Sequence, residues 1–446
     1  MPTLPLLTHA TLDQTMAWRQ GAAITVQQFL GDVAHLAAML PAGKHVLNIC
    51  RDRYHFSVGL AAAMVTDKVS LLPPTHTSEM VRQLQAYSAD VFCLHDSEDC
   101  ETALPLLRYP AMPDAPVAPM AIPQIDSRQL VAIVFTSGST SAPIPHAKTW
   151  GSLVKNVRAQ AMRLGLEQGT RYTILGTVPP QHMYGFESTV LLPLQSGNAL
   201  SSAQPFYPAD IRSAIEAIPG PRVLASTPLH LRLLLEAGLA MPEAALVLSA
   251  TAPLSTQLAQ KIESSFHAPL LEIYGSTETG QIATRRTVQT PEWQLFPAVQ
   301  LTQQGEHMWA AEGHIELPVA LNDIIELTTD DRFLLHGRQQ DLINIAGKRS
   351  SLSSLNHHLN AIAGMIDGAF YMPEETHDHV TRLCACVVAP GLSAQTIMTA
   401  LRACMDPVFL PRPLLFVPAL PRNSTGKLPG EALQKLVESH MAQNTA

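Results

Sequence analysis

A run of small hydroxyl residues follows a short apolar segment in the first third of the chain. Residues 131–135 (VAIVF) are apolar and mostly β-branched or aromatic, which predicts a buried strand. The run after them consists of Thr136, Ser137, Gly138, Ser139, Thr140 and Ser141. Its closely spaced hydroxyl and backbone N–H donors suit a polyphosphate, but a surface turn rich in Ser and Thr explains it equally well. The segment has neither the GxxxxGK[ST] nor the GxGxxG pattern.

A second group of chemically useful residues stands at the end of a predicted strand, residues 270–274 (LLEIY). The segment YGSTETG that closes this strand supplies one aromatic ring, two threonines and a single carboxylate. An aromatic ring can stack on adenine, a threonine hydroxyl can reach a phosphate, and a carboxylate can hold Mg²⁺. These residue types together indicate a nucleotide site.

Two further strand ends bear residues that can contact a small ligand. His182 and Tyr184 follow the predicted strand 172–178 in a turn bounded by Pro and Gly, and the small residues 249–254 (SATAPL) follow the predicted strand 245–249. Ligands of α/β sheets bind near the carboxyl ends of strands, and small side chains let a flat ring approach the backbone. From the residues alone, a solvent-facing loop histidine is the better explanation of the first segment. An ordinary strand-to-helix turn is nearly as good for the second.

Taken in order, these segments resemble the adenylate-forming superfamily, which includes acyl- and aryl-CoA synthetases, adenylation domains of peptide synthetases and firefly luciferase. The family's phosphate loop follows the pattern TSGTTGxPKG, and residues 136–140 and Pro143 match it. Three positions depart from it, namely Ser141, Ile144 and Pro145. Lys148 lies four residues beyond the family's lysine, so we expect it to be a surface residue that contributes less than that lysine.

The resemblance implies which residues bind ATP and Mg²⁺. YGSTETG is similar to the family's YGxTE, which implies that Tyr274 and Gly275 contact adenine, Thr277 the phosphate and Glu278 the metal. The phosphate loop, with Lys148 nearby, would hold the phosphates. SATAPL is similar to a small-residue stretch that packs against adenine and substrate, which assigns Ala250 and Thr251 to the nucleotide.

Two later segments resemble the family's ribose-binding elements. NDIIEL contains Asp323, and HGRQQD contains Arg338, and each would contact a ribose hydroxyl. Arg349, in the following segment INIAGKR, joins the nucleotide-binding set. The alternative for Arg338 is an ordinary surface ion pair with Asp341, worth about 0–1 kcal/mol.

The resemblance also implies the acid pocket and the catalytic residues. QHMYGF is similar to a histidine element that lines the pocket of the carboxylate substrate, so the pocket is expected around His182, Tyr184, Ser249 and Gly280. PRNSTGK is similar to PRTxSGK, which implies that Lys427 is the adenylation lysine. Composition alone would make Lys427 a solvated tail residue. The expected catalytic set is Lys427, His182 and Thr277.

The elements that position these residues follow from hydrophobic periodicity. Residues 26–39 predict a helix, and alternating helices and strands over residues 45–95 predict a parallel, doubly wound α/β sheet. Prolines make residues 105–125 a loop or linker. We expect a large N-terminal α/β domain, residues 1–338, which binds ATP and the acid. A hinge near residues 339–341 would join it to a small, mobile α+β domain, residues 339–446.

Composition narrows the partners and the compartment. The chain has 446 residues, 46% hydrophobic and 15% charged, and a net charge of −8, which disfavours nucleic acid as a partner. Its six cysteines form no disulfide or CxxC framework, and the N-terminus lacks the features of a signal peptide. No apolar run is long enough to cross a membrane. We therefore expect a cytoplasmic protein.

The expected activity is a ligation in two steps. A carboxylate attacks the α-phosphate of ATP to give an acyl-AMP, and a phosphopantetheine thiol then accepts the acyl group. The short chain and the HAKTW and INIAGKRSSL segments resemble aryl-acyl-carrier-protein ligases of aryl polyene and xanthomonadin pathways. This implies a 4-hydroxybenzoate-like acid and an acyl carrier protein as acceptor. A CoA synthetase that uses free coenzyme A and a catalytically reduced nucleotide-binding regulator remain as alternatives.

Overall fold

The structure is a computed structural model of the chain. It describes residues 2–112, 120–136, 143–167, 169–305, 307–338, 341–345, 348–373, 383–423, 426 and 428–443. Expectations for residues 137–140 and for Lys427 lie outside these ranges, as do the side chains of Arg338 and Arg349.

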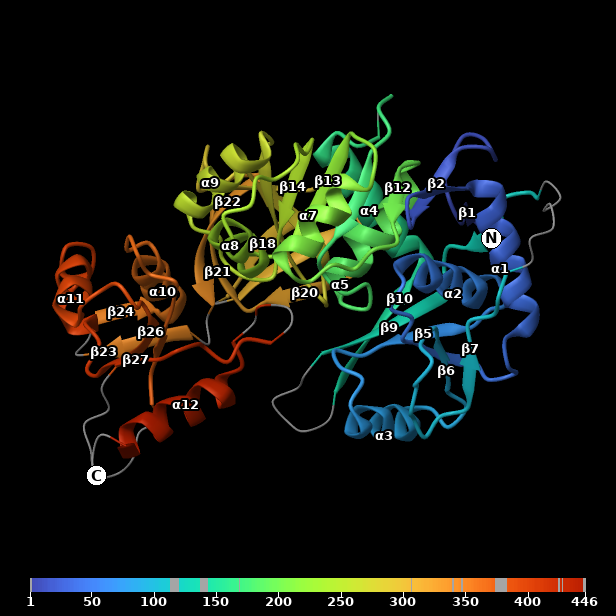
Figure 1. Ribbon diagram of the computed structural model, residues 1–446. Helices are drawn as coiled ribbons and strands as arrows, with labels where there is room; N and C mark the ends of the chain where they lie inside the picture. The colour runs from blue at the N-terminus through green and yellow to red at the C-terminus, as the bar shows by residue number, and fades with distance from the viewer. Residues whose placement is uncertain are drawn as a thin grey trace.

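The first large sheet contains the predicted alternation of strands and helices. Its order is β10-β9-β5-β4-β6-β7, and all neighbouring strands are parallel except β10 and β9. The strands are β4 (His45–Asn48), β5 (Val69–Leu72), β6 (Phe92–His95), β7 (Leu106–Arg108), β9 (Leu130–Thr136) and β10 (Ile144–Thr149). The helices among them are α1 (Val26–Met39), α2 (Arg53–Val65) and α3 (Ser78–Tyr87). Figure 1 shows this group in blue and cyan.

Helix α1 illustrates why the periodicity predicts structure here. Thr25 caps the helix, and it exchanges hydrogen bonds with Gln28 in a capping box. Of five apolar residues at helical spacing, four are each no more than 2% exposed, namely Phe29, Leu30, Val33 and Leu36, whereas Leu40 after the helix end is half-buried. A capped start and one apolar stripe therefore fix both the beginning and the orientation of this helix.

The second large sheet has a parallel centre and antiparallel ends. Its order is β21-β22-β17-β16-β15-β14-β13-β11-β12-β2-β3, and it is parallel from β15 to β2. The strands are β2 (Thr15–Arg19), β3 (Ala22–Thr25), β11 (Thr173–Gly176), β12 (Ala199–Ser201), β13 (Arg222–Ser226), β14 (Leu246–Ser249), β15 (Leu270–Ser276), β16 (Gly280–Arg285), β17 (Trp293–Leu295), β21 (Asp323–Thr329) and β22 (Arg332–Arg338). Helices α7 (Pro208–Glu216), α8 (Pro228–Glu236) and α9 (Thr256–Phe266) alternate with its strands. The expected α/β class with doubly wound sheets is confirmed.

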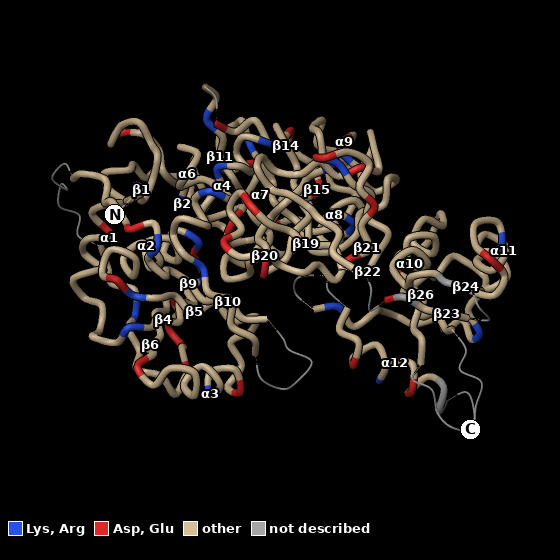
Figure 2. Tube along the Cα trace, turned by 180° about the vertical axis from the view of Figure 1, so that it is seen from behind, with Lys and Arg blue, Asp and Glu red and all other residues tan. Residues whose placement is uncertain are grey.

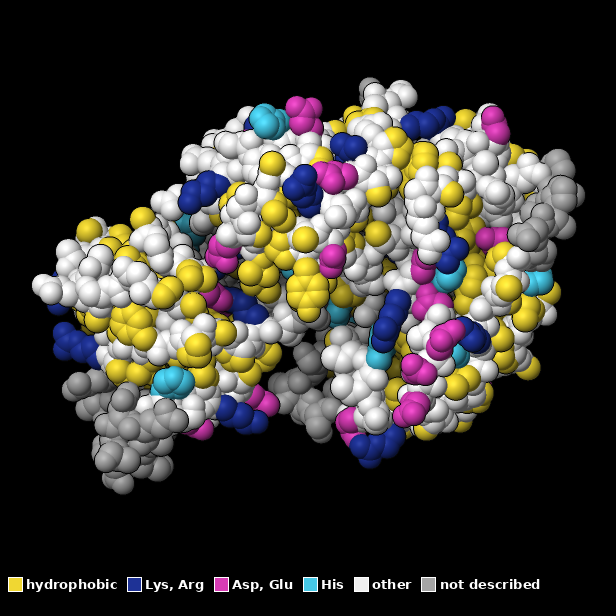
Figure 3. Space-filling view, in the orientation of Figure 1, with side chains coloured by type: hydrophobic (Ala, Val, Ile, Leu, Met, Phe, Trp, Pro, Cys, Tyr) yellow, Lys and Arg dark blue, Asp and Glu magenta, His cyan; other side chains and the backbone are white. Residues whose placement is uncertain are grey.

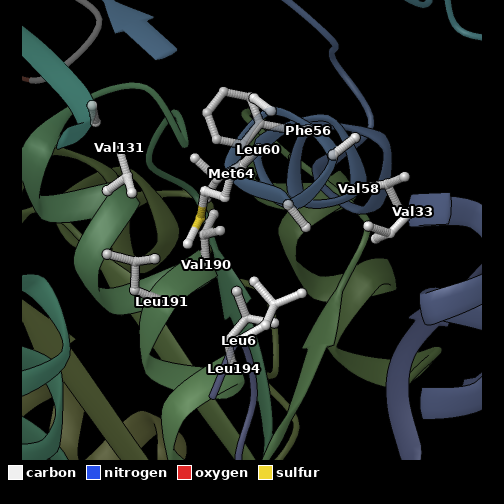
Figure 4. Close-up of a cluster of buried hydrophobic side chains, with 14 of the residues drawn as sticks. Leu6, Val33, Phe56, Val58, Leu60, Met64, Val131, Val190, Leu191 and Leu194 are labelled. Carbon is white, nitrogen blue, oxygen red and sulfur yellow. The ribbon is translucent and has the colours of Figure 1, made fainter. Parts of the chain in front are cut away.

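A helical layer packs between these sheets. It comprises α5 (Met183–Gly185), the π-helix η1 (Phe186–Leu191) and α6 (Leu192–Ser196), and it packs against α4 (Trp150–Leu164). All residues from 183 to 195 are buried. Figure 4 shows Val190 of this layer beside Met64 of α2, and Leu194 beside Leu6, within one buried cluster.

The C-terminal residues form a smaller α+β part with its own apolar clusters. Its strands are β23 (Leu342–Ile345) paired with β24 (Lys348–Ser351), and a sheet of β25 (Asp367–Tyr371), β26 (Cys384–Val388) and β27 (Leu414–Phe416). Its helices are α10 (Leu352–Asn360), α11 (Ala394–Arg402), the 3₁₀ helix η3 (Pro407–Phe409) and α12 (Gly430–Gln443). Figure 1 shows these orange and red elements together at one end of the molecule.

Small sheets complete the N-terminal part. Strands β18 (Gln300–Gln304), β19 (His307–Glu312) and β20 (Ile315–Leu321) form an antiparallel sheet, and β1 (Thr3–Pro5) pairs with β8 (Gln124–Asp126). None of the helices in the described ranges is both long and apolar enough to cross a membrane. Figures 2 and 3 show acidic and basic residues interspersed over the molecule. The charge distribution therefore does not mark the candidate site, which is located from side-chain contacts instead.

The local structure departs from the sequence-based expectation at three places. Residues 105–125 are not a continuous loop, because they include β7 and the start of β8. The proline-containing exit of the phosphate loop is the strand β10, at the edge of its sheet, where a missing N–H is tolerated. The turn expected at His182 and Tyr184 is the start of the buried helical layer.

Candidate active site

The β9–β10 hairpin brings the end of the predicted phosphate strand close to the 274–280 turn. Thr136 Oγ1 shares a hydrogen bond of 2.9 Å with His146 Nε2, and the same nitrogen lies 3.6 Å from Glu278 Oε1. Burial lowers the pKa of His146, and the Glu278 carboxylate opposes that shift. Sequence analysis does not select His146, since the prolines before it indicate a loop. This histidine joins two predicted nucleotide-binding segments that are far apart in sequence.

The Glu278 carboxylate is suited to hold a metal ion together with a phosphate. Burial alone would raise its pKa, but hydrogen bonds from its own backbone N–H and from Ser276, with the charges of His146 and Lys148, hold the pKa below its usual value. The side chain is 44% exposed. Mg²⁺ usually takes one or two carboxylates and completes its shell with phosphates and water. Within the described ranges, no group of three or more His, Cys, Asp or Glu could hold a metal.

Lys148 is buried, which corrects the expectation of a surface residue. Only 8% of it is exposed, and its Nζ donates to the backbone oxygen of Glu278 at 3.2 Å. Strand β10 exposes Ala147 and turns Lys148 inward, as the alternation of a strand requires. Burial lowers the pKa of Lys148, and the carboxylates of Glu187, Glu278 and Glu316 oppose that shift.

Two glycines allow the 274–280 turn to lie close to its neighbours. A Cβ on Gly275 would come within 2.2 Å of the Gly280 backbone oxygen. Gly280 has a φ of +71°, and a Cβ there would lie 2.5 Å from Asn156 Nδ2 and 2.9 Å from Glu187 Oε1. Neither position accepts a larger residue without a shift of the surrounding atoms. The turn therefore lies directly against buried polar side chains of α4 and η1.

The predicted adenine and ribose residues lie side by side. The Tyr274 hydroxyl donates to Asp323 Oδ2 at 2.7 Å, and the Tyr274 ring lies 5.6 Å from the rings of both Trp293 and Phe333. Asp323 on β21 is paired with Arg338 on β22, so both predicted ribose residues occupy one rung of the sheet. The backbone of Arg349 lies on β24, opposite Asn344.

The predicted acid-pocket residues stand at strand ends, but they differ in environment. His182 is half-buried at the start of α5, whereas Tyr184 is 9% exposed and packs in a hydrophobic cluster. Ser249 is fully buried at the end of β14, and its Oγ has no partner among the described residues. Ala250 and Thr251 follow, and Thr251 has a positive φ of 79°. Thr277 is half-buried in the turn beside Glu278.

A cavity of about 180 Å³ adjoins the 274–280 turn on its inner side. Of the four predicted acid-pocket residues, all within the described ranges, Gly280 alone lines it. Its polar lining also includes residues that sequence analysis missed, namely Asn156, Glu187, His314 and Glu316. The one available sequence signal is Glu187, a carboxylate in the otherwise apolar and small stretch 185–194.

The segment before the predicted adenylation lysine lies near the strand ends. Lys427 itself is outside the described residues. A Cβ on its neighbour Gly426 would lie 3.3 Å from Leu229 Cβ and 4.0 Å from Thr227 Oγ1, at the start of α8. Helix α8 directly follows β13, so this tail segment lies at the carboxyl end of the second sheet.

Comparison with known proteins identifies the class. The family described as AMP-binding enzyme matches residues 10–324, and the chain belongs to that family. A 4-coumarate–CoA ligase of Rhodobacter capsulatus is 29% identical over 297 residues, 66% of this chain and 74% of the relative. A 3-hydroxybenzoate–CoA/4-hydroxybenzoate–CoA ligase of Thauera aromatica is 22% identical over 368 residues, 73% of this chain and 70% of the relative.

Solved structures share the fold over nearly the whole chain. An o-succinylbenzoate CoA synthetase from Bacillus subtilis, in complex with its acyl-adenylate, has a TM-score of 0.81 at 16% identity and covers 97% of this chain and 99% of its own. ATP-bound MatB from Rhodopseudomonas palustris has a TM-score of 0.81 at 15% identity, with 96% and 97% covered. The protein is therefore an adenylate-forming enzyme of the acid–thiol ligase class, which uses ATP to activate an acid as acyl-AMP.

Proposed function

We propose that the enzyme activates an aromatic carboxylic acid of the 4-hydroxybenzoate type and transfers the acyl group to a phosphopantetheine thiol. The observation that supports this most directly is the meeting of the β9–β10 hairpin with the 274–280 turn through Thr136, His146 and Glu278. It places a carboxylate, an imidazole and the start of the hydroxyl-rich loop at one point. Phosphoryl chemistry needs such positioning and charge neutralisation more than a protein nucleophile.

The nucleotide is proposed to lie along the carboxyl edge of the second sheet. Tyr274, Gly275, Ala250 and Thr251 would hold adenine, and the paired Asp323 and Arg338 would hold the ribose. Residues 136–140, Thr277 and Lys148 would surround the phosphates, with Arg349 close to the nucleotide. The Tyr274–Asp323 hydrogen bond supports this arrangement, because it orients the carboxylate beside the aromatic ring.

Mg²⁺ is proposed to bind at Glu278 when ATP is present. When bound, this ion would neutralise charge on the phosphate oxygens. The half-exposed, ionised carboxylate fits an ion that takes most of its ligands from phosphate and water. Hydrogen bonds from its own backbone N–H and from Ser276 hold the pKa of this carboxyl below its usual value, and His146 and Lys148 add to that shift.

The C-terminal part is proposed to move as a domain. Residues 1–338 would bind ATP and the acid, and residues 339–446 would rotate about a hinge near 339–341 to present Lys427 for adenylation. His182 and Thr277 would complete the catalytic set. The position of Gly426 against α8 supports this, because it puts the tail segment at the strand ends where the nucleotide is expected.

Two thiol acceptors remain in competition. The short chain and its HAKTW segment favour an acyl carrier protein, whereas the similar relatives are CoA ligases, which favours free coenzyme A. Both acceptors present the same thiol on the same phosphopantetheine arm. They differ in whether a folded carrier protein must dock.

A pyrophosphate-release screen tests the first half of the proposal. The purified enzyme is given ATP, Mg²⁺ and a panel of benzoic, cinnamic and long-chain fatty acids, and release is expected to be greatest with a benzoate. Thioester formation is then measured by mass spectrometry with coenzyme A and with a holo-carrier protein. Stronger activation of long-chain fatty acids would contradict the aromatic substrate, and thioester formation only with coenzyme A would contradict the carrier protein.

A further inference from the structure

The cavity beside the 274–280 turn is lined by ionisable groups that are rarely buried, and burial raises the pKa of Glu187 to about 8. It lies between α4, η1 and the tip of the β19–β20 hairpin, and Glu187 and Lys148 are 1% and 8% exposed. No ion pair within 4.0 Å joins these two among the described side chains. Their charges nevertheless act on each other, since each opposes the pKa shift that burial imposes on the other. The Lys148 ammonium donates to the Glu278 backbone oxygen, but neither it nor Glu187 has an ion-pair partner among the described side chains. Buried ionisable groups in this condition are expensive, so a group that bridges them would be stabilising.

Glu187 lines the cavity and has an unused acceptor. It lies on η1 in the fully buried helical layer, and its Oε1 has no hydrogen-bond partner among the described residues. The absent side chain of Gly280 leaves this oxygen open toward the turn, because a Cβ there would lie 2.9 Å away. An unsatisfied buried oxygen of a carboxylate costs stability unless something donates to it.

Asn156 presents a second unused acceptor to the same cavity. Its Nδ2 donates to the backbone oxygen of Gln281 at 3.1 Å, which fixes the orientation of the amide. Its Oδ1 is buried and has no partner within the described ranges. Asn156 Nδ2 and Glu187 Oε1 both lie within 3 Å of the position that a Cβ on Gly280 would take. The two side chains are therefore neighbours on the same side of Gly280.

We propose that Glu187 and Asn156 recognise a hydrogen-bond donor, a hydroxyl or amino group, on the ring of the acid substrate, with Lys148 supplying the compensating charge. This rests on the proposed function, because the same turn that holds Gly280 holds Thr277 and Glu278 at the phosphate. An acid whose carboxylate lies at that turn can extend its ring past Gly280 into the cavity. The space of about 180 Å³ suits one substituted ring, since a cavity of about 150 Å³ holds benzene.

The two acceptors are expected to discriminate against acids whose ring has no hydrogen-bond donor, as well as to bind those that have one. A ring without a donor would leave both acceptors unsatisfied and would expel any water that bonds to them. Sites built to hydrogen-bond a substrate hydroxyl discriminate strongly against the analogue that lacks it. A simple apolar slot would discriminate far less. Glu187 and Asn156 are thus specificity-determining residues, and the alternative occupant of the cavity is ordered water alone.

The test compares acids that differ only at the ring substituent. Pyrophosphate release is measured with 4-hydroxybenzoate, 3-hydroxybenzoate, 4-aminobenzoate, 4-methoxybenzoate and benzoate. The wild-type kcat/KM is expected to favour an acid with a donor over benzoate and the methoxy acid by about 10²-fold or more. The hydroxy and amino acids distinguish which donor is used.

Three variants locate the source of that preference. Glu187→Met removes the acceptor at similar volume, and the preference should fall to within about threefold while ATP affinity is unchanged. Glu187→Gln keeps an acceptor and should retain part of the preference, which separates recognition from a loss of folding. Glu316→Gln is the matched control, because Glu316 lines the same cavity but is exposed and already accepts from the Thr149 hydroxyl at 2.6 Å.

The outcomes separate this inference from the function on which it rests. If no acid supports pyrophosphate release, the proposed function fails. If acids are activated but donors give no advantage, or Glu187→Met keeps the full wild-type preference, the cavity holds only water and the inference is overturned. A preference that falls in Glu187→Met, survives in part in Glu187→Gln and is unchanged in Glu316→Gln establishes it.

Discussion

Glu278 is the residue proposed to hold Mg²⁺. Its carboxylate is half exposed and kept ionised by His146, Lys148 and nearby hydrogen bonds. Glu278→Gln keeps the shape and removes the charge, so we expect the apparent KM for Mg·ATP to rise by about tenfold or more, most clearly at limiting magnesium. Pyrophosphate release titrated with Mg²⁺ measures this. The same titration with Glu316→Gln should match the wild type, and an unshifted curve for Glu278→Gln would remove it from the metal role.

Because Lys148 is buried beside carboxylates, its charge is expected to affect adenylation. It faces the Glu187 and Glu278 carboxylates, and Lys148→Met would leave Glu187 buried without a nearby cation. The pKa of Glu187, already raised by burial, should then rise further, so the carboxyl is protonated at a higher pH. We expect adenylation to fall by about tenfold, the usual effect of losing a buried charge contact of about 1.4 kcal/mol.

A matched control separates this effect from a general loss of a lysine. Lys155→Met alters an exposed lysine on α4 and should leave adenylation unchanged. If Lys148→Met and Lys155→Met behave alike in pyrophosphate release, Lys148 has no role at the site. If Lys148→Met abolishes release completely at normal thermal stability, Lys148 takes the full role of the missing loop lysine.

At the scale of elements, the β19–β20 hairpin is held to the 274–280 turn by a neutral histidine. His314 Nε2 donates to the Thr279 backbone oxygen at 2.8 Å, and burial lowers the pKa of His314 to about 4. Because the pKa of His314 is lower in the folded than in the unfolded chain, its burial as a neutral base contributes stability fully only above the unfolded pKa of about 6.5. That contribution is lost as pH falls from 6.5 to about 4.

The consequence is a pH-dependent melting temperature. His314→Gln can still donate but cannot titrate, so its melting temperature should fall less steeply between pH 6.5 and 4.5 than that of the wild type. Some slope should remain, because burial also lowers the pKa of His9 to about 4. The exposed His307, in the same hairpin, provides the control His307→Gln, which should keep the wild-type slope. Parallel curves for all three proteins would exclude this role of His314.

Hydrophobic periodicity predicts helices and strands well where the structure of a segment depends mainly on its own residues. The helix at residues 26–39 has the predicted bounds, since its capped start and its apolar stripe are both local features of the sequence. Strand β10 was missed because prolines indicate a loop, and a sheet edge tolerates them only through pairing with β9. The helical layer after His182 was missed because its burial depends on both large sheets at once.

The residues of the candidate site likewise fall into two groups, those in contiguous motifs and those that only the folded chain brings together. The segments TSGST and YGSTETG are contiguous, so their resemblance to the family's motifs predicts nucleotide binding without any tertiary information. The cavity residues are not contiguous. Lys148 contacts Glu278 across 130 positions, and Asn156 contacts Gln281 across 125. No periodicity or motif records such pairs, so Asn156, His146 and His314 are found only when the chain is folded.

At the scale of the whole molecule, Lys427 is proposed to act in only one of the two half-reactions. Its ammonium would neutralise charge between the acid and the α-phosphate only when the C-terminal part presents it. Lys427→Ala is therefore expected to lower pyrophosphate release by about 10²–10³-fold. With a pre-made acyl adenylate and a thiol acceptor, the same variant should form thioester at close to the wild-type rate. An equal loss in both assays would mean that one arrangement serves both steps.

A network of ions joins the C-terminal part to α8 in the arrangement seen here. Asp367 on β25 accepts from Arg422 at 2.6 and 2.8 Å, and Arg422 also donates to the Gly426 backbone oxygen at 3.0 Å. Arg232 on α8 lies 3.7 Å from Asp367 and donates to the Ile366 backbone oxygen. The network thus connects the N-terminal part to the segment that precedes Lys427.

This arrangement should favour adenylation, because it keeps Gly426 against the strand ends. Arg232→Ala removes the link between the two parts without touching the substrate residues, so adenylation should fall by about threefold to tenfold, the effect of about 1 kcal/mol. Thiol transfer from a pre-made adenylate should be unchanged or faster, since the proposed rotation for that step would break the link. Arg212→Ala, which removes an exposed ion pair with Glu216 on α7, should change neither assay. A loss of thiol transfer as deep as the loss of adenylation would show that the Arg232–Asp367 contact supports the fold in general and favours neither half-reaction.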